Sequence, residues 1–218
     1  MFDLDGTLID TAPDLIGALN AVLAEQNLPP VALSDTRHLV GHGAKTMIER
    51  GFARAGAPLP PEKIPALFDR FIELYLGRIA QDSVMFDELE TTLDLLAAQG
   101  AKLAVCTNKR TDLSLALLDA TGLTWRFAAV VGPDMAPAPK PDPRHLLTAI
   151  AMAGGSVERA LMVGDSISDV LAAKAADVPV AVVSFGYTET PAHELGGDVL
   201  IDHFTELPAI ARRLLARA

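Results

Sequence analysis

The sequence is poor in cysteine and in aromatic residues. Its 218 residues include one cysteine, Cys106, one tryptophan and two tyrosines. A single cysteine excludes an intramolecular disulfide and a metal site built from several cysteines. The chain is long enough to bury a sizeable apolar core, so we expect burial, and not cross-links, to hold the fold together.

Basic residues are also scarce. The chain has 18 lysines and arginines against 28 aspartates and glutamates, a formal net charge of −10. A nucleic-acid partner requires a basic surface that neutralises phosphates, so we expect no nucleic-acid binding. A small anionic ligand remains compatible with this charge, provided that its site is locally positive or holds a metal.

Long apolar runs are missing as well. No run of 18 or more apolar residues occurs, and the N-terminus lacks the basic and then apolar stretch of a secretory signal. We therefore expect no membrane span and a cytoplasmic location.

Short apolar runs rich in valine, leucine and alanine are present instead. They lie at residues 103–106, 128–131, 160–163 and 180–183. They do not alternate with polar residues, which is typical of strands buried on both faces of a parallel sheet. Helices are expected around 88–99, 110–121, 143–153, 167–176 and 205–217. This alternation predicts an α/β fold with a doubly wound, mostly parallel, Rossmann-like sheet.

A helical segment interrupts this pattern near the start. Residues 1–4 have the character of a first strand, yet the next buried strand begins only near Lys102. Apolar residues recur at helical spacing in 15–23 and 64–75, and prolines separate these stretches. We expect residues 13–80 to form an inserted helical cap, and residues 1–12 and 81–218 to form the α/β catalytic core.

Polar residues follow the expected strands at their carboxyl ends, where ligands bind in open α/β sheets. They are Asp3, Asp5, Thr107, Asn108, Lys140, Asp165 and Asp169. Most of them, taken singly, are ordinary loop or capping residues, although a carboxylate inside an apolar strand is costly without a partner. Together, the carboxylates would repel one another unless a cation lies among them. Oxygen ligands of this kind suit Mg²⁺ and phosphoryl chemistry.

These residues belong to four motifs. DLDGTL at 3–8, TN at 107–108, KPDP at 140–143 and GDSISD at 164–169 resemble, in order, the motifs of the haloacid dehalogenase-like hydrolases. Weaker similarities, LVGHGA at 39–44 and SFGY at 184–187, resemble the phosphoglycolate phosphatase branch of that family. The resemblance implies a phosphatase that acts on a small phosphate ester, with 2-phosphoglycolate as the expected substrate.

The resemblance also implies roles for the residues of the motifs. Asp3 would be the nucleophile that forms an aspartyl-phosphate. Asp5 would protonate the leaving group and then activate water. Thr107, Asn108 and Lys140 would bind the phosphate group of the substrate.

The expected cofactor is Mg²⁺. The resemblance implies that Asp3, the main-chain carbonyl of Asp5 and Asp165 hold the ion. Asp169, one helical turn beyond Asp165, would hold a metal-bound water or orient the ligands.

The cap contains a locally basic stretch. Residues 31–54 carry four basic and two acidic residues, which is either a solvated helix face or a second anion site. In the second interpretation, Gly41, His42 and Gly43 would open a helix whose free amides bind the substrate. Lys45 or Arg50 would add positive charge.

Two alternatives remain open at this point. A related enzyme could act on sugar phosphates or another small ester, including as a phosphomutase. From a different class, a phosphorylated receiver module also combines an acidic cluster, a threonine and a lysine on an α/β sheet. We expect a monomer or a homodimer.

Overall fold

The computed structural model describes residues 1–41 and 43–216. Five short strands form its sheet, and all of their pairings are parallel. They are β3 (Ala104–Cys106), β4 (Ala129–Val131), β5 (Met162–Gly164), β6 (Val180–Val183) and β7 (Val199–Ile201). Strand β3 pairs with β4, and β5 pairs with β6, which pairs with β7.

The first residues of the chain lie at the centre of this sheet. Phe2 bridges in parallel to Val105 on one side and to Val163 on the other. Its main-chain N–H donates to Ala104 at 2.9 Å, and the N–H of Asp3 donates to Val163 at 2.9 Å. The segment therefore joins β3 to β5 and delivers Asp3 to the carboxyl edge of the sheet, where the strand order reverses.

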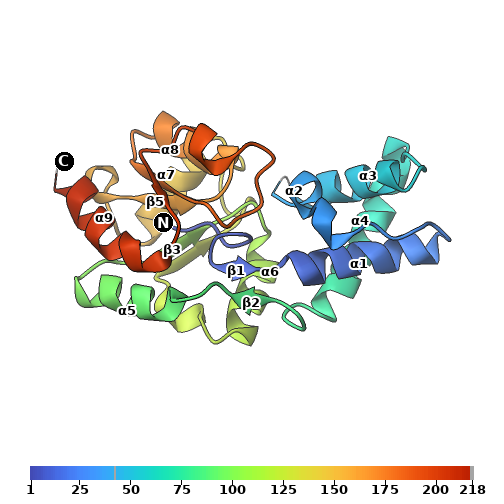
Figure 1. Cartoon of the computed structure of the whole chain (residues 1–218), viewed down its shortest axis with the longest axis horizontal. Helices are drawn as coiled ribbons and strands as arrows, with labels where there is room; N and C mark the ends of the chain where they lie inside the picture. The colour runs from blue at the N-terminus through green and yellow to red at the C-terminus, as the bar shows by residue number, and fades with distance from the viewer. Residues whose placement is uncertain (42, 217–218) are drawn as a thin grey trace.

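Helices cover both faces of the sheet (Figure 1). They are α5 (Leu89–Ala98), α6 (Thr111–Ala120), α7 (Pro143–Met152), α8 (Ile167–Ala175) and α9 (Leu207–Leu215). Helices α5 and α9 pack on one face with Val105 and Val183, whereas α7 and α8 pack on the other with Cys106 and Val182. Neighbouring strand residues thus enter opposite apolar layers, which explains the continuous apolar runs of the sequence.

The predicted doubly wound α/β fold is confirmed, and the predicted strands and helices occur within a few residues of their expected bounds. Strand β7 was not predicted. It has three residues between Asp198 and Asp202, and Leu200 in its centre is exposed. Such a short, half-buried edge strand does not produce a long apolar run.

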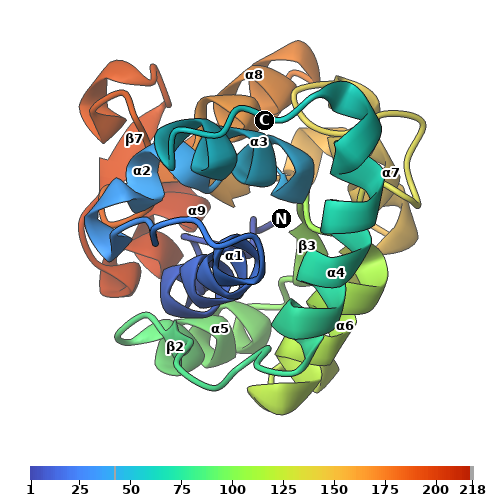
Figure 2. The ribbon, with the colours of Figure 1, turned by 90° about the vertical axis from the view of Figure 1, so that its right-hand side faces the viewer.

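The inserted helices form a separate layer beside the sheet, at the right of Figure 1 and toward the viewer in Figure 2. They are α1 (Ala12–Glu25), α2 (Thr36–Leu39), α3 (Ala44–Arg54) and α4 (Ile64–Leu76). Their buried side chains form one apolar cluster with Leu113 of α6. Gly51 permits the close approach of α1 and α3, since a Cβ there would lie 2.7 Å from the Leu19 side chain. A helical cap on an α/β core is therefore present.

Two chain segments connect the helical layer to the sheet, and they run side by side. β1 (Ile9–Asp10) pairs antiparallel with β2 (Val84–Met85). Buried Asp14 at the start of α1 binds the returning segment: Arg78 Nε donates to it at 3.1 Å, and Ser83 Oγ at 2.7 Å. The main-chain amides of Asp82 and Ser83 donate to the same carboxylate at 3.0 and 2.8 Å.

No helix in the described part of the chain combines the length and the apolar character that crossing a membrane requires.

We predict that Asp14→Asn lowers the unfolding free energy at pH 7 by about 2–3 kcal/mol, because it weakens charge-assisted hydrogen bonds in a buried place. Burial raises the pKa of Asp14, but hydrogen bonds from Ser83, Asp82 and Arg78 outweigh it and hold the pKa below its usual value. The contribution of Asp14 is thus complete above its unfolded-state pKa of about 3.9 and is lost as the pH falls through the lower folded-state pKa.

Urea unfolding at pH 7 and at pH 3 measures this difference. The gap between wild type and Asp14→Asn should narrow at the lower pH, whereas exposed Asp119→Asn on α6 should change stability by less than about 0.5 kcal/mol at both. Equal effects of the two substitutions at pH 7 would contradict the role of Asp14.

Candidate active site

Asp3 occupies the centre of the carboxyl edge of the sheet. Its side chain is 13 % exposed and lies 3.1 Å from the Lys140 ammonium. The N–H of Leu4 donates to its Oδ1 at 2.8 Å. Burial raises the pKa of Asp3 to about 6, against the opposing effect of Lys140 and with a further increase from Asp169. The group is thus a nearly buried carboxylate that opens onto a cavity.

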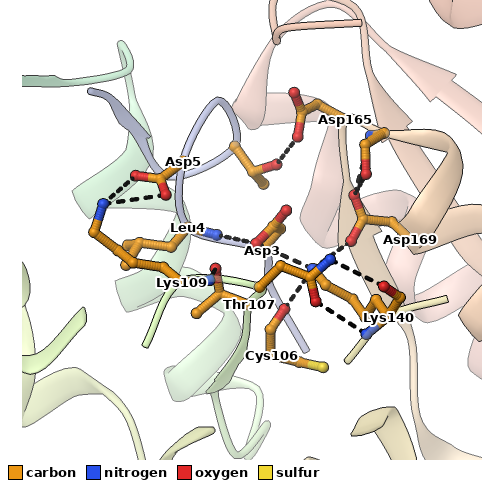
Figure 3. A network of polar contacts seen from close by, with 12 residues as sticks. Asp3, Leu4, Asp5, Cys106, Thr107, Lys109, Lys140, Asp165 and Asp169 are labelled. Carbon is orange, nitrogen blue, oxygen red and sulfur yellow. Dashed lines mark hydrogen bonds and ion pairs between the residues drawn. The ribbon is translucent and has the colours of Figure 1, made fainter. Parts of the chain in front are cut away.

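Asp3, Asp165 and Asp169 form a carboxylate cluster (Figure 3). One carboxylate oxygen from each lies within 4.8 Å of the others. Asp165 accepts from Thr7 Oγ1 at 3.1 Å and from the N–H of Tyr187 at 2.7 Å. Burial raises the pKa of Asp165 well above its usual value, and the charges of Asp3 and Asp169 raise it further.

This donor set fits a divalent cation with oxygen ligands such as Mg²⁺. Three clustered carboxylates carry more negative charge than the single Lys140 ammonium can balance, and a bound cation would relieve the repulsion. Gly186 lets the chain approach closely here, since a Cβ at this position would lie 2.2 Å from the Asp165 Cβ. The carboxylate of Asp5 lies outside this cluster.

Lys140 is the cation of the cluster, with a side chain only 1 % exposed. Its Nζ donates to Asp169 Oδ1 at 2.6 Å and to the Cys106 carbonyl at 2.7 Å. Burial lowers the pKa of Lys140, but Asp169 and Asp3 outweigh this effect, and the pKa lies above its usual value. The other oxygen of Asp169 accepts from the N–H and the hydroxyl of Ser166 at 3.0 and 2.7 Å. Asp169 therefore orients Lys140.

Asn108 and His145 hold the backbone around Lys140. Asn108 donates to the Lys140 carbonyl at 3.0 Å and accepts from its N–H at 2.9 Å. The same N–H donates to Nδ1 of buried His145 at 3.1 Å, so Nε2 carries the proton and faces the Val131 carbonyl at 3.1 Å. Burial and the nearby Lys140 lower the pKa of His145. Both ends of the Asn108 amide thus bind the chain itself, although the residue also lines the cavity.

Asp5 points away from Asp3, toward Lys109 (Figure 3). Its Oδ1 accepts a hydrogen bond from Thr11 Oγ1 at 2.7 Å. Lys109 Nζ lies 3.0 Å from Oδ1 and 3.2 Å from Oδ2 of the same carboxylate. Lys109 is nearly buried, and its Nζ lies 4.4 Å from the centroid of the Tyr75 ring on α4. Thr107 is buried, and its hydroxyl accepts from the N–H of Lys109 at 3.2 Å.

A cavity of about 540 Å³ joins these residues to the helical layer. Asp3, Asp5, Thr107 and Lys140 line it from the core, and Gly41, Gly43 and Lys45 line it from the cap, together with Phe68, Phe71 and Tyr75 of α4. The expected helix start is confirmed: α3 begins at Ala44, directly after Gly43.

Two other residues of the cap, His42 and Arg50, were also expected at the site. His42, expected to bind substrate, lies outside the described residues. Arg50, one of two candidates for added charge, donates instead to the Glu189 carboxylate at 2.6 Å and to the His38 carbonyl at 2.7 Å on the surface.

The sequence search missed several residues that shape the site. Lys109 directly follows the Thr-Asn pair at a strand end, which is a usable signal for a lysine near a phosphate. Thr7 and Thr11 lie in or just beyond the first motif. Tyr187 belongs to the SFGY stretch at 184–187, which indicated a branch of the family but not the contact of the Tyr187 N–H with Asp165. His145 contacts the main chain of Lys140 and of Val131, and no local pattern indicates it.

The carboxyl edge of the parallel sheet holds a candidate carboxylate nucleophile, an acidic cluster and a buried lysine, and a helical cap closes over them. These features define the class of capped α/β phosphohydrolases. The sequence profile of the haloacid dehalogenase-like hydrolases matches residues 1–183. The chain belongs to this family, as the motifs predicted. A receiver module, the alternative from another class, is thereby excluded.

Relatives and solved structures agree with this assignment. A protein of Caulobacter vibrioides named phosphoglycolate phosphatase is 55% identical over 98% of this chain and 90% of its own length. One of the same name from Agrobacterium fabrum is 47% identical over 100% of this chain and 94% of its own length. The crystal structure of a predicted phosphoglycolate phosphatase from Haemophilus somnus superposes with a TM-score of 0.88 at 29% identity, covering 96% of this chain and 95% of that one. CbbY from Rhodobacter sphaeroides, solved in complex with phosphate, gives 0.78 at 28% identity over 94% of each chain.

We predict that Asp3 contributes a loss of stability to the metal-free protein as the pH rises from about 4 to 7. The folded-state pKa of Asp3, about 6, lies above its unfolded-state value, so the folded protein binds more protons in this range and stability falls with pH. Asp3→Asn should therefore be more stable than wild type at pH 7 without metal, by on the order of 1–2 kcal/mol. Mg²⁺ should raise the melting temperature of wild type and have much less effect on Asp3→Asn.

Thermal unfolding in chelator and in excess Mg²⁺ tests both statements, with exposed Asp87→Asn as the matched control. A wild type that Mg²⁺ does not stabilise would contradict binding of the ion by this cluster. An Asp3→Asn variant with the wild-type pH dependence in chelator would contradict the raised pKa of Asp3.

Proposed function

We propose that the protein is a Mg²⁺-dependent phosphatase that hydrolyses 2-phosphoglycolate to glycolate and phosphate. The observation that carries this proposal is the Asp3 carboxylate beside the Lys140 ammonium, 3.1 Å apart, at a cavity roofed by the cap. The name shared by the relatives from Caulobacter vibrioides and Agrobacterium fabrum supports the substrate.

Asp3 is the nucleophile in this proposal. One of its carboxylate oxygens attacks phosphorus, the bond from phosphorus to the glycolate oxygen breaks, and an aspartyl-phosphate forms on Asp3. Lys140 offsets the negative charge of the phosphoryl group and lets it approach an anionic nucleophile. The Thr107 hydroxyl and the main-chain N–H of Asn108 contribute further contacts to phosphate oxygens in this proposal, since the side-chain amide of Asn108 binds the main chain of Lys140.

Asp5 moves the protons. It donates one to the departing glycolate oxygen, and it then accepts one from the water that attacks the aspartyl-phosphate. The bond from phosphorus to Asp3 breaks in this second step, which releases phosphate and restores the Asp3 carboxylate. One carboxyl group carries out both proton transfers. It must therefore reach the departing glycolate oxygen and the oxygen of the attacking water from the same position.

Mg²⁺ would be held by the carboxylates of Asp3 and Asp165 and by the main-chain carbonyl of Asp5, with Asp169 orienting the set. When bound, the ion neutralises negative charge on the transferring phosphoryl group. The buried, mutually repelling carboxylates support this assignment.

The cap selects the substrate in this proposal. We assign residues 13–80 to the cap and residues 1–12 and 81–218 to the core, joined at the β1 and β2 segments. The amides that open α3 after Gly41, His42 and Gly43 would contact the leaving group and exclude water during transfer. The cytoplasmic location, the absence of a nucleic-acid partner and the monomeric or homodimeric state stay predictions.

A sugar phosphate is the second candidate substrate. A cavity of about 540 Å³ is larger than phosphoglycolate requires, and a sugar phosphate would also fit. A phosphomutase that acts on sugar phosphates would use the same core residues.

We expect kcat/KM for 2-phosphoglycolate to exceed that for glucose 6-phosphate and for phosphoserine by roughly tenfold or more in the presence of Mg²⁺. Gly43→Leu should reduce this preference, because Gly43 lines the cavity and a leucine there adds bulk at its cap side. Gly56→Leu is the matched control: both glycines have a similar positive φ, 84° and 81°, and open space around a Cβ, but Gly56 does not line the cavity. Preference for a sugar phosphate, or equal effects of the two substitutions, would contradict the proposed substrate and the role of the cap.

A further inference from the structure

Lys109 is a buried lysine to which the proposed reaction gives no task. Its side chain is 5 % exposed, and lysine is rarely buried unless it is paired. Its Nζ lies 3.0 and 3.2 Å from the two oxygens of Asp5. Among the residues that the structure describes, the Tyr75 ring is the other partner of this charge, with its centroid 4.4 Å from Nζ. The pairing therefore connects the proposed proton-transfer group with helix α4 of the cap.

The cap side of this contact is rigid and apolar. Tyr75 stacks on Phe71 with ring centroids 6.0 Å apart, and both rings are buried. The Tyr75 hydroxyl has no hydrogen-bond partner among the described residues. Of the described residues that line the cavity, Asp3 and Asp5 are the acidic ones, and both belong to the core. In this part of the protein, Asp5 is accordingly the anion that stabilises buried Lys109.

The same pairing holds Asp5 in an unproductive position. Thr11 and Lys109 bind its carboxylate, which points away from Asp3 (Figure 3). A group that serves the leaving oxygen must turn toward the phosphoryl group attached to Asp3. Turning away would leave the Lys109 ammonium buried without a partner, and such an unpaired buried charge is strongly unfavourable. The release of Asp5 therefore requires another anion at Lys109.

We propose that Lys109 binds a second anionic group of the substrate, a carboxylate at the end remote from phosphorus, and that this exchange of partners releases Asp5 for catalysis. The inference rests on the proposed phosphatase function and deepens it. An ammonium has three N–H donors, so Lys109 can contact the incoming carboxylate before its contact with Asp5 is lost. Substrates without a second anion would leave Asp5 bound to Lys109.

Lys45 is the competing cation in the same cavity. It lies on the cap, is exposed, and has its Nζ 5.5 Å from the centroid of the Phe68 ring. Water can solvate an exposed ammonium, and Lys45 forms no ion pair with Asp5 or with another described carboxylate. Binding of a carboxylate at Lys45 would thus add affinity without freeing Asp5.

The test compares two phosphate esters of matched size, 2-phosphoglycolate and ethyl phosphate, which lacks the carboxylate. The measured quantity is the ratio of their kcat/KM values with Mg²⁺ in wild type, Lys109→Met, Lys109→Arg and Lys45→Met. Methionine keeps the unbranched shape and most of the length of the lysine side chain, and it can pack on the Tyr75 ring. We expect Lys109→Met to lower the ratio by about 10- to 100-fold, the range of a charge-assisted contact. Lys109→Arg should restore part of it, and Lys45→Met should change it by less than about threefold.

A ratio that Lys109→Met leaves unchanged, or one that only Lys45→Met lowers, would overturn the inference. Wild type that releases phosphate from neither ester would instead refute the proposed function, so the two failures are distinguishable. A crystal structure of Asp3→Asn with 2-phosphoglycolate provides a test that does not depend on how the Lys109 variants fold. It should show the substrate carboxylate on Lys109 with Asp5 turned away, and an intact pair of Lys109 and Asp5 with the carboxylate elsewhere would contradict the proposal.

Discussion

The buried ammonium of Lys140 between Asp3 and Asp169 is the interaction on which the rest of the site depends. Three carboxylates converge where the central segment and β5 end, and a single lysine side chain reaches between them. Removal of this ammonium would leave buried carboxylates without a cationic partner, a change that commonly costs about 3–5 kcal/mol. The contacts of Asn108 and His145 to the backbone of Lys140 then have a clear purpose, since they fix the position of the only ammonium within the cluster described here.

The sequence was informative about the core because each of its signals is local. Continuous apolar runs indicate strands buried on both faces, and polar residues after those runs indicate the carboxyl edge of the sheet. The four motifs then identified the family, which the profile match confirmed. Strand β7 escaped this reasoning because only one of its three residues is buried. The first strand is reduced to Phe2 and its immediate neighbours, yet the main-chain hydrogen bonds on both sides place it as expected.

The cap was less predictable, and the reason is physical. Helical periodicity indicates which face of a helix is buried, but not which polar residue at its end turns toward a distant sheet. Arg50 and Lys45 lie on the same helix, and only the contact of Arg50 with Glu189, 139 residues away in the sequence, shows that it faces outward. Lys109 is the opposite case. It lies beside a recognised motif, but its importance becomes apparent only when Asp5 and Tyr75 are seen on either side of it.

The central claim is that Asp3 carries the phosphoryl group during turnover. The most direct measurement is rapid quenching of the enzyme with 2-phosphoglycolate and Mg²⁺ in acid, followed by peptide mass spectrometry. The account predicts an acid-stable phosphoryl group on the peptide that contains Asp3, which appears within one turnover and is absent from Asp3→Asn. A phosphoryl group on another residue, or turnover by folded Asp3→Asn without a phosphorylated enzyme, would contradict it.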